Sequence, residues 1–441
     1  MKLKEIVLEF ISGDWGAESK SLKNPCKIRC IRGADFQPLQ TNGKLDSAPI
    51  RYVAGNSLST KKLKKGDIVI EKSGGSPTQS TGRALYVSDA MIEGGGDIMC
   101  SNFCVAIRVN SNWNSKYFYY FWTYLYSLGV FFNFESKTSG IKNLQLDSVL
   151  SSIEFPSVPL EQQKKVVSIF NGIEEKILLN RKINRNLEAL VRQLYDYWFV
   201  QFDFPDENGR PYKSSGGKIV KNEFLGREIP VHWTHTTIER YADIHSGATP
   251  PTSVQSNYGG DVIWITPKDL SDQSQKFTFK GERAITTAGY NSCSTTLLPK
   301  GTVLMSSRAP IGLLSIAATE LCTNQGFKNL VPKRNKEQRF LYYLVSQHLP
   351  IIKQMGGGTT FHEISRDQLS KLKVPNVPSQ IIEYWDLKVK PIFDKQELLL
   401  REIDVLTQQR DELLPLLMNG QVSIISPEIN CDLSKKQTKS R

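Results

Sequence analysis

Four motifs that many enzymes use to bind or activate a substrate are absent from this sequence. It has no Gly-x-x-x-x-Gly-Lys-Ser/Thr phosphate loop, so nothing indicates an ATP-driven motor. It also lacks Gly-x-Gly-x-x-Gly after a predicted strand, His-Glu-x-x-His, and the Asn/Asp-Pro-Pro-aromatic tetrapeptide with which amino-methyltransferases hold a flipped base. We therefore expect no catalytic residue in this chain and interpret it as a recognition and assembly protein.

Cysteines are few, seven in 441 residues, and no apolar signal core accompanies them at the N-terminus. An odd number without a signal predicts a reducing, cytoplasmic compartment. The spacing of Cys26 and Cys30 is wrong for most zinc knuckles, and the alternation of Cys26, Ile28 and Cys30 favours the inner face of a strand. We expect no metal site.

Long hydrophobic runs are missing too, so we expect no membrane span. The apolar, aromatic stretches 117–132 and 340–352 are short, and we interpret both as buried core helices. The net charge of +12 favours a polyanionic partner, with nucleic acid ahead of a membrane surface. Hydrophobic content of 39% and charged content of 23% are ordinary for a globular chain with room for two domains.

Two stretches 219 residues apart carry the same heptad pattern. Steps of four and three give ten seam positions in each stretch, of which eight are apolar, as in helices that pack along one another. The first set is Val166, Phe170, Ile173, Ile177, Asn180, Asn184, Leu187, Val191, Leu194 and Trp198, and the second is Trp385, Val389, Ile392, Gln396, Leu399, Ile403, Leu406, Arg410, Leu413 and Leu417. The sequence therefore predicts a tandem duplication in which each copy ends in a long helix.

The duplication extends upstream of these helices. Leu63–Val69 matches Leu298–Leu304, and Cys100–Asn102 matches Cys322–Asn324. The offset between the copies falls by 13 from the first match to the second, which predicts an insert at 73–83 of the first copy. Short β-type runs mixed with helices predict an α+β, or mixed α/β, globular domain in each copy. A Pro-x-x-Pro step precedes each long helix.

The predicted boundaries follow from these patterns. They are a first globular domain at 1–158, a first long helix at 159–202, a linker at 203–230, a second globular domain at 231–377, a second long helix at 378–425 and a basic disordered tail at 426–441. Gly172 and Pro391 occupy equivalent positions and weaken a helix, so we expect each long helix to break or kink there.

We expect the two helices to form an antiparallel coiled-coil pair with one domain at each end, related by a pseudo-twofold axis. Asn180 and Asn184 would lie near Gln396 and Arg410 in the seam. Two interpretations stay open: these polar residues fix the register, or they face solvent where the helices splay.

A rod of about 50 Å between two domains suits DNA, because it could separate two half-sites by up to about fifteen base pairs. Polar and basic residues in the predicted loops are the candidate DNA contacts, although any single lysine is more often a solvated surface residue. They are Lys72, Arg83, Lys137, Lys142, Lys268, Arg308, Asn324, Gln325 and Lys328. We favour Arg83, Arg308, Asn324 and Gln325, which lie in loops of small and polar residues.

Four stretches resemble the specificity subunit of type I restriction–modification systems: Leu160–Lys164, Asn180–Leu190 (NRKINRNLEAL), Leu194–Pro205 (LYDYWFVQFDFP), and Ser307–Gly312 (SRAPIG) together with Thr323–Gly326 (TNQG). The resemblance covers nearly the whole chain up to Ser426. The second helix departs from the family pattern at Tyr384–Trp385 and Pro391.

The resemblance implies that 1–158 and 231–377 are target-recognition domains and that 159–202 and 378–425 are the spacer helices that join them. It also implies a bipartite double-stranded DNA site and no cofactor bound by this chain. It implies two modification subunits that bring S-adenosylmethionine and methylate adenine N6, and restriction subunits that use ATP and magnesium to translocate and cleave DNA. The alternative hypothesis is a non-catalytic coiled-coil scaffold without DNA specificity.

Overall fold

The computed structural model describes the chain except residues 43–44, 77, 139–140, 274, 358–362 and 420–441. The tail predicted at 426–441 lies outside the described residues. The chain divides into two compact units, the first formed by Met1–Arg181 together with the residues from Glu402 onward, and the second by Lys182–Arg401. Both boundaries cut through a long helix, so each unit contains one globular part and one half of each long helix.

The first unit is built on an antiparallel sheet with the order β1-β8-β4-β6. Its strands are β1 (Val7–Ser12), β8 (Cys104–Val109), β4 (Ile68–Glu71) and β6 (Ala84–Tyr86). A second sheet has the order β3-β2-β7, and a third has β5-β10-β9. They contain β3 (Ile50–Val53), β2 (Cys26–Ile31), β7 (Ile98–Cys100), β5 (Ser73–Gly74), β10 (Ile141–Leu144) and β9 (Glu135–Thr138). The short helices of this unit are α1 (Phe36–Asn42), α2 (Gly55–Lys61), α3 (Asp89–Gly95) and α5 (Leu146–Ser152).

An aromatic helix, α4 (Ser115–Ser127), lies in the core of the first unit. Asn114 caps its N-terminus by accepting hydrogen bonds from the backbone N–H groups of Lys116 and Tyr117. Tyr117, Phe118 and Trp122 on this helix are fully buried and belong to the same cluster as the sheet residue Ile107. The expectation of a buried core helix at 117–132 is confirmed up to Ser127, where the helix ends; Leu128 and Phe132 beyond it are exposed.

The second unit repeats this topology. Its main sheet has the order β14-β21-β18-β19-β16, and a second sheet has β17-β15-β20. If the edge strand β16 is left out, the order β14-β21-β18-β19 corresponds to β1-β8-β4-β6 of the first unit, and β17-β15-β20 corresponds to β3-β2-β7. This correspondence confirms the tandem duplication. The strands are β14 (Ala242–Ser246), β21 (Phe327–Pro332), β18 (Val303–Ser306), β19 (Leu314–Ala317), β16 (Phe277–Thr278), β17 (Ala284–Ile285), β15 (Tyr258–Ile265) and β20 (Cys322–Thr323).

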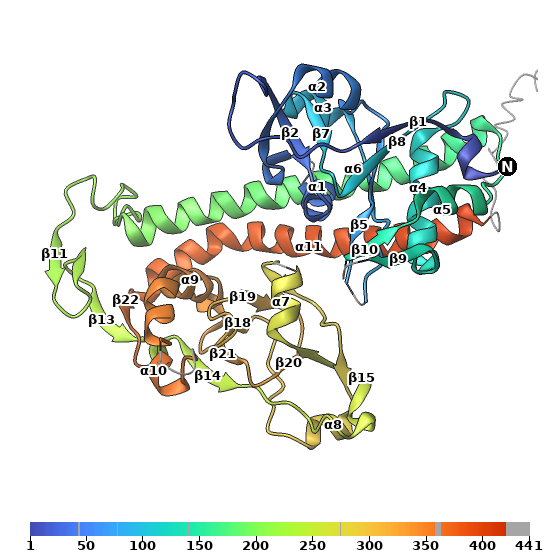
Figure 1. Cartoon of the computed structure of the whole chain (residues 1–441). Coiled ribbons are helices and arrows are strands. Elements are labelled where there is room, and N and C mark those ends of the chain that lie inside the picture. Colours follow the sequence, from blue (N-terminus) through green and yellow to red (C-terminus); the bar gives the residue numbers. More distant parts are fainter. Residues whose placement is uncertain (43–44, 77, 139–140, 274, 358–362, 420–441) are drawn as a thin grey trace, which may run out of the picture. The chain divides into compact units, whose positions relative to one another are not determined.

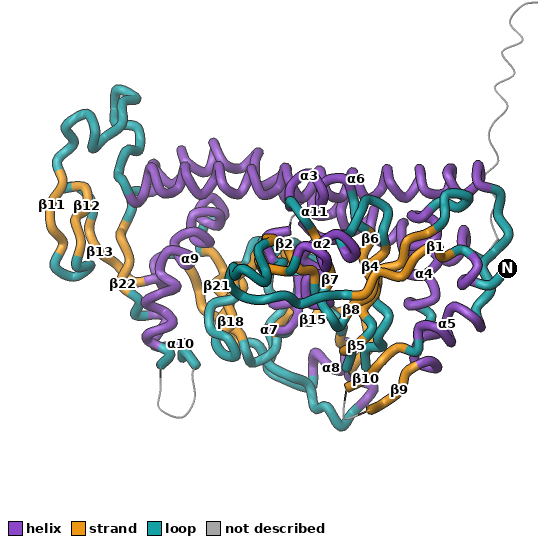
Figure 2. Tube along the Cα trace, turned by 45° about the horizontal axis from the view of Figure 1, so that its top comes forward, coloured by secondary structure: helices purple, strands orange, loops and turns teal. Residues whose placement is uncertain are grey.

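Helix α9 (Gln338–Met355) takes the place of α4 in the second unit, and α7 (Pro267–Gln273), α8 (Thr287–Asn291) and α10 (Arg366–Ser370) complete its helices outside the long pair. The segment predicted to be a linker folds into a hairpin of β11 (Ile219–Asn222) and β12 (Arg227–Pro230). β13 (Thr234–Thr237) pairs with β22 (Lys373–Asn376). Each unit is thus a mixture of helices and strands, as the sequence predicted (Figures 1 and 2).

The insert of the first copy is not confined to the predicted segment 73–83. Ile68 pairs with Tyr86 in the first unit and Val303 with Ile316 in the second, so the loop between these strands is only five residues longer in the first. The remaining additional residues fall between β6 and β7, where the chain forms helix α3. The prediction was therefore wrong in part. It assigned all the additional residues to the Gly- and Ser-rich loop, although some of them lie near the short helix α3.

The two long helices are α6 (Leu160–Tyr195), followed by a π-helical turn over Asp196–Val200, and α11 (Ser379–Met418). They begin directly after the Pro-x-x-Pro steps. Neither helix is interrupted at Gly172 or Pro391, so the predicted breaks were wrong. Both residues are on exposed faces, and the carbonyl that Pro391 leaves without a donor belongs to Leu387, which is also exposed and can bond to water.

Within each unit the halves of α6 and α11 run antiparallel. In the first unit Phe170 shares a core with Leu414, and Asn180 Nδ2 donates to Glu402 Oε2 at 2.9 Å. In the second unit the rings of Tyr195 and Trp385 lie 6.0 Å apart. Residue numbers rise on one helix as they fall on the other. All twenty predicted seam positions, including Leu187, Trp198, Leu399, Ile403 and Leu406, are buried or half-buried.

Of the two asparagines in the seam, Asn180 has a side-chain partner, whereas the side-chain oxygen of Asn184 is buried without a hydrogen-bond partner among the described residues. Asn180 is 1% exposed and pairs with Glu402, and the backbone carbonyl of Asn184 accepts from Gln396 Nε2 at 3.5 Å. The expected neighbour Arg410 lies elsewhere and bonds to Asp411. The antiparallel register explains this difference, because it places Glu402, two turns before Arg410, opposite Asn180.

Candidate nucleic-acid interface

Four segments of the first unit meet at one end of its main sheet, where β1 and β4 end and β6 and β8 begin. We call these segments the first loop cluster: Gly13–Trp15, the described residues of 72–83, Ser101–Phe103, and Lys142–Asn143 of β10. The Lys72 N–H donates to the Phe103 carbonyl at 2.9 Å, and the Leu144 N–H donates to the Lys72 carbonyl at 2.8 Å. A Cβ on Gly13 would lie 1.9 Å from the Ser101 carbonyl oxygen, so only glycine allows this close approach.

Arg83 is held in a bidentate ion pair within this cluster. Its Nε and Nη2 atoms donate to the two carboxylate oxygens of Glu71 at 2.8 and 2.7 Å. The Glu71 side chain is 7% exposed and that of Arg83 is 27% exposed. The hydrogen bonds to Glu71 raise the pKa of Arg83 above its usual value. A guanidinium engaged in this way supports the loop, and its remaining exposed edge could face a DNA phosphate.

Lys142 is also paired. Its ammonium group lies 3.0 Å from Glu135 Oε2 and 4.9 Å from the centre of the Phe132 ring. Burial acts to raise the pKa of Glu135, but hydrogen bonds from Thr81 and Lys142 outweigh it, and the pKa is lowered. Lys72 is exposed, and Lys137 lies on β9. The cluster therefore combines the exposed Lys72 with two largely buried ion pairs.

The second unit has an equivalent set of segments, which we call the second loop cluster: Gly247–Thr249, Ser307–Gly312, Thr323–Gly326 and Glu363. A Cβ on Gly247 would lie 2.2 Å from the Thr323 carbonyl oxygen. This close approach resembles that of Gly13 to Ser101 in the first unit. The isolated antiparallel β-bridge between the backbones of Arg308 and Glu363 corresponds to the strand pairing of Ser73 with Asn143 in the first unit. The duplication therefore builds the same loop scaffold twice.

Glu363 organises the second loop cluster. Its Oε1 accepts from Ser307 Oγ at 3.2 Å and from Lys328 Nζ at 3.3 Å, and Arg308 Nη1 lies 3.6 Å from Oε2. Lys328 is 7% exposed, so it is a support of the loop, whereas the Arg308 side chain is 42% exposed and faces solvent. Sequence reasoning missed Glu363 because it selected only residues that could donate to phosphates or bases.

The other predicted contacts in the second unit differ in role. The Asn324 side-chain oxygen accepts from the Gly326 N–H at 2.9 Å, which makes it a turn residue. Gln325 is exposed and its carboxamide oxygen accepts from the Thr249 hydroxyl. Lys268 is exposed on α7 and pairs with Glu282 at 2.8 Å. Arg308, Asn324, Gln325 and Lys328 belong to the second loop cluster.

The cysteine alternation forms the strand that was expected. β2 carries Cys26 and Cys30, and burial raises the pKa of Cys30 to about 12. In the part of the chain that the structure describes, no three His, Cys, Asp or Glu side chains are grouped so that they could hold a metal ion. No helix there has the length and apolar character needed to span a bilayer.

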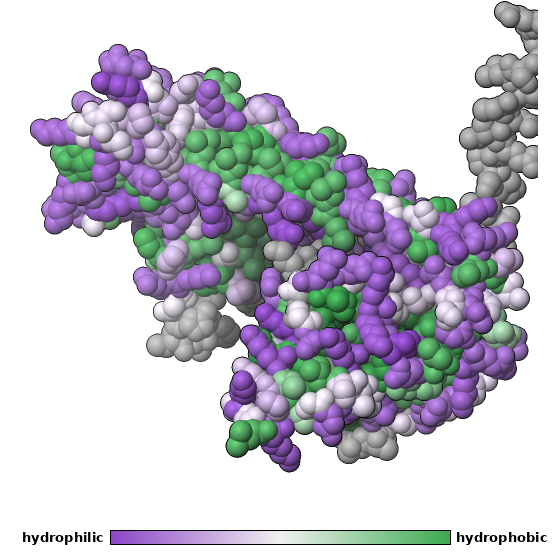
Figure 3. Space-filling model, turned by 90° about the horizontal axis from the view of Figure 1, so that it is seen from above, coloured by the Kyte–Doolittle hydropathy of each residue, from purple (hydrophilic) through white to green (hydrophobic). Residues whose placement is uncertain are grey.

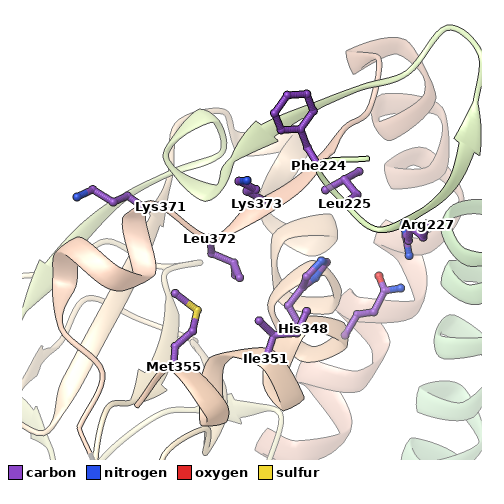
Figure 4. Close-up of a pocket in the computed structure, with 10 residues that line it drawn as sticks. Phe224, Leu225, Arg227, His348, Ile351, Met355, Lys371, Leu372 and Lys373 are labelled. Atoms are coloured by element: carbon purple, nitrogen blue, oxygen red, sulfur yellow. The ribbon is translucent and has the colours of Figure 1, made fainter. Parts of the chain in front are cut away.

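A hollow of about 440 Å³ lies in the second unit between the hairpin β11–β12, helix α9 and strand β22 (Figure 4). Phe224 and Arg227 from the hairpin, His348 and Ile351 from α9, and Lys373 from β22 are among its lining residues. Burial lowers the pKa of His348 below its usual value, so the imidazole is neutral at pH 7. The lining includes none of the predicted DNA contacts.

The comparison with known families identifies the fold. The family model described as "Type I restriction modification DNA specificity domain" matches residues 2–189 and again 230–414. The chain belongs to this family. The two matches coincide with the two copies found in the sequence, and each includes a globular part and most of one long helix.

Individual relatives agree with this assignment. The MjaIX specificity subunit of Methanocaldococcus jannaschii is 40% identical over 153 residues, which are 34% of this chain and 35% of that protein. The match thus spans about a third of that relative. The HindI specificity subunit of Haemophilus influenzae is 25% identical over 82% of this chain and 88% of its own. The crystal structure of the S subunit from M. genitalium has the same fold, with a TM-score of 0.56, 14% identity and 95% coverage of both chains.

The Arg83–Glu71 pair leads to a prediction about stability. We expect Arg83→Met to lower the free energy of unfolding by about 2–3 kcal/mol, because the Glu71 carboxylate keeps its buried place without a counter-charge. The value is below that of a fully buried pair because Arg83 remains partly hydrated. Urea unfolding followed by circular dichroism measures the change.

Lys268→Met is the matched control for this experiment, because it removes a cation whose ion pair is exposed on both sides. It should leave the urea midpoint unchanged. Equal midpoints for Arg83→Met and the wild type would show that Arg83 does not support the loop.

Proposed function

We propose that this chain is the non-catalytic DNA specificity subunit of a type I restriction–modification complex, reading a bipartite, asymmetric double-stranded DNA site. The observation that carries the proposal is a loop scaffold built twice with different side chains. The first loop cluster presents Lys72 and Phe103, whereas the second presents Arg308 and Gln325. Side chains that differ at equivalent positions would read unlike half-sites.

The long helices would set the distance between the half-sites. α6 contains 36 residues, and at about 1.5 Å per residue such a helix extends about 50 Å. A paired helix is stiffer than a loop, so a complex built on it would leave a gap of constant length between the two short motifs. The contact between buried Asn180 and partly exposed Glu402 supports a single register for the pair.

The partners would be two modification subunits and the restriction subunits of the complex, in the cytoplasm. S-adenosylmethionine, ATP and magnesium would be bound by these partners and not by this chain. Exposed apolar side chains along the long helices support protein docking there: Leu179, Leu190, Leu398 and Val405 are each at least half exposed. Figure 3 shows hydrophobic residues reaching the surface on the face that it draws.

Methylome sequencing of host cells with and without this chain tests the proposal. We expect adenine methylation at one split motif, made of two unlike half-sites with a constant gap, that disappears when the chain is deleted. Binding of the assembled complex to that duplex should weaken steeply as salt rises, because cations on the loops release counterions from the phosphates. A single contiguous motif would contradict the two-reader model.

Gel shifts with scrambled duplex DNA supply the control for this proposal. If the assembled complex bound the split motif and scrambled DNA equally well, the scaffold without DNA specificity would be the better description.

A further inference from the structure

Phe103 is a large apolar side chain presented to solvent by a fixed backbone. The Cys104 N–H donates to the Ser101 carbonyl at 2.9 Å and closes a turn, with Phe103 near its apex. The Phe103 carbonyl accepts from the N–H groups of both Lys72 and Ser73, at 2.9 and 3.0 Å. The ring, in contrast, is 56% exposed. The protein therefore fixes the position of this residue without burying its side chain.

A second support holds the same turn. The side-chain oxygen of Asn102 accepts from the Trp15 N–H at 3.0 Å, which ties the turn to the segment that follows β1. Hydrogen bonds from two other segments of the first loop cluster thus converge on two consecutive residues, Asn102 and Phe103. Because the hydrogen bonds already fix the backbone of this turn, little backbone conformational entropy would be lost when the ring meets a partner.

The surroundings of Phe103 indicate what that partner is. Ser101, Asn102, Lys72 and Ser73 adjoin it, and these residues are polar or basic. Exposed apolar patches larger than a few hundred Å² mark many protein-binding sites, whereas these neighbours of Phe103 are polar or basic. A nucleic acid complements this surface, because its anionic backbone suits the basic Lys72 and its flat bases suit the exposed Phe103 ring.

The equivalent turn of the second unit carries no aromatic residue. Ser12 pairs with Val105 in the first unit, and the equivalent Ser246 pairs with Lys328 in the second. This register aligns Phe103 with Gln325 and Gly326. Gln325 is exposed and its carboxamide hydrogen-bonds to Thr249. The two domains therefore present different chemistry from the same place on the scaffold.

We infer that Phe103 is an apolar wedge that inserts its ring between neighbouring base pairs of the first half-site, whereas the second domain contacts its half-site at this place through the polar Gln325. Apolar side chains inserted in this way partly unstack a base step and bend the duplex. The inference rests on the proposed function and adds a mode of DNA recognition that differs between the two domains.

The test uses the assembled complex and duplexes that carry 2-aminopurine at successive purines of the first half-site. We expect the wild type to raise 2-aminopurine fluorescence at one base step, because the base there is unstacked. Phe103→Ala should abolish this rise and weaken binding about tenfold, in the range measured for loss of a stacked aromatic. Phe103→Leu, which keeps an apolar wedge, should retain part of both effects.

Leu8→Ala is the matched control, because Leu8 is 66% exposed on the same sheet but lies toward the other end of β1. It should change neither fluorescence nor affinity. Urea midpoints of all variants should equal that of the wild type, since both side chains are exposed.

Two results would overturn the inference while leaving the proposed function intact. One is specific binding by Phe103→Ala at the wild-type affinity. The other is a loss of affinity when one thymine is replaced by uracil, without any fluorescence change, which would show contact with a methyl group instead of insertion. A wild-type complex that does not prefer the split site would overturn the proposed function, and this inference with it.

Discussion

Replacing Lys276 with methionine should lower the free energy of unfolding of the second unit by about 3–5 kcal/mol, because it leaves the Glu188 carboxylate without its counter-charge. The Lys276 ammonium group lies 2.8 Å from Glu188 Oε2, 2.8 Å from the Tyr343 hydroxyl and 3.0 Å from Gln396 Oε1. It also lies 3.6 Å from the centre of the Phe393 ring. The Lys276 side chain is 6% exposed and that of Glu188 is 30% exposed, so water compensates the remaining carboxylate only in part.

The large effect follows from the elements that this one ammonium group joins. Glu188 belongs to α6, Tyr343 to α9, and Gln396 and Phe393 to α11. Lys276 itself directly precedes β16 at the edge of the main sheet. One buried charge therefore connects the second domain to both long helices within its unit, and its loss weakens several contacts together.

A double variant separates loss of the pair from loss of packing. Lys276→Met combined with Glu188→Leu removes both charges and should recover much of the stability, because apolar groups of similar size can replace a buried ion pair. Urea unfolding of the full chain, followed by tryptophan fluorescence, measures both variants. A single variant within 1 kcal/mol of the wild type would show that Glu188 finds another partner.

The same pair gives stability a characteristic pH dependence. Burial lowers the pKa of Lys276 from 10.5 to about 8, opposed by Glu188 and assisted by the nearby charges of Arg192 and Arg339. Between pH 8 and pH 10.5 the unfolded chain therefore binds more protons at this site than the folded chain, and the contribution of Lys276 to stability rises with pH. The difference in stability between wild type and Lys276→Met should grow across this window.

Replacing Trp122 with alanine should lower the free energy of unfolding of the first unit by about 3–5 kcal/mol. The side chain is fully buried, and its ring lies 4.6 Å from that of Phe131 and 6.1 Å from that of Phe118. The indole N–H donates to the Gly82 carbonyl at 2.7 Å. Alanine therefore leaves both a cavity and a buried carbonyl without its donor.

The effect of Trp122→Ala should extend to DNA recognition, because Gly82 belongs to the first loop cluster. We expect the complex to methylate duplexes altered in the first half-site more readily than the wild type does, whereas discrimination against changes in the second half-site should be less affected. Trp122→Phe keeps an aromatic ring and removes only the hydrogen bond, so its cost should be about 1 kcal/mol plus the smaller change in packing. Circular dichroism and methylation of duplexes altered in one half-site measure the two effects.

Leu128→Ala is the control for Trp122, because Leu128 directly follows the same helix and is 59% exposed. It should change stability by no more than about 0.5 kcal/mol. If Trp122→Ala relaxed discrimination at both half-sites equally, the indole would be supporting the unit as a whole and not this loop in particular.

The heptad seam and the duplication could be predicted because they are periodic. Apolar residues every three or four positions mark the buried face of a helix wherever the partner lies, and the seam positions are buried as expected. Contacts that depend on tertiary structure could not be read in this way. Glu135 meets Lys142 across a sheet, and Glu363 meets Lys328 from a distant loop, so neither pair has a local sequence signal.

The loop residues show the same limit. Arg83 was predicted to contact DNA because it lies in a loop of small residues, but two of its N–H groups donate to Glu71, twelve positions earlier. Phe103 was not selected, because an isolated aromatic residue in a sequence cannot be distinguished from a core residue. The signal that identifies it is its exposure on a turn held by three other residues.

The core of the first unit also determines when this protein can finish folding. Val166 and Phe170 are covered by Leu414, Leu417 and Met418, which are synthesised almost 250 residues later. Until then the first domain covers this stripe only in part, through contacts such as the Tyr120 ring 4.6 Å from that of Phe170. A nascent chain therefore exposes apolar surface that favours aggregation while the second domain is synthesised, and truncation before Leu414 would leave that surface open to water.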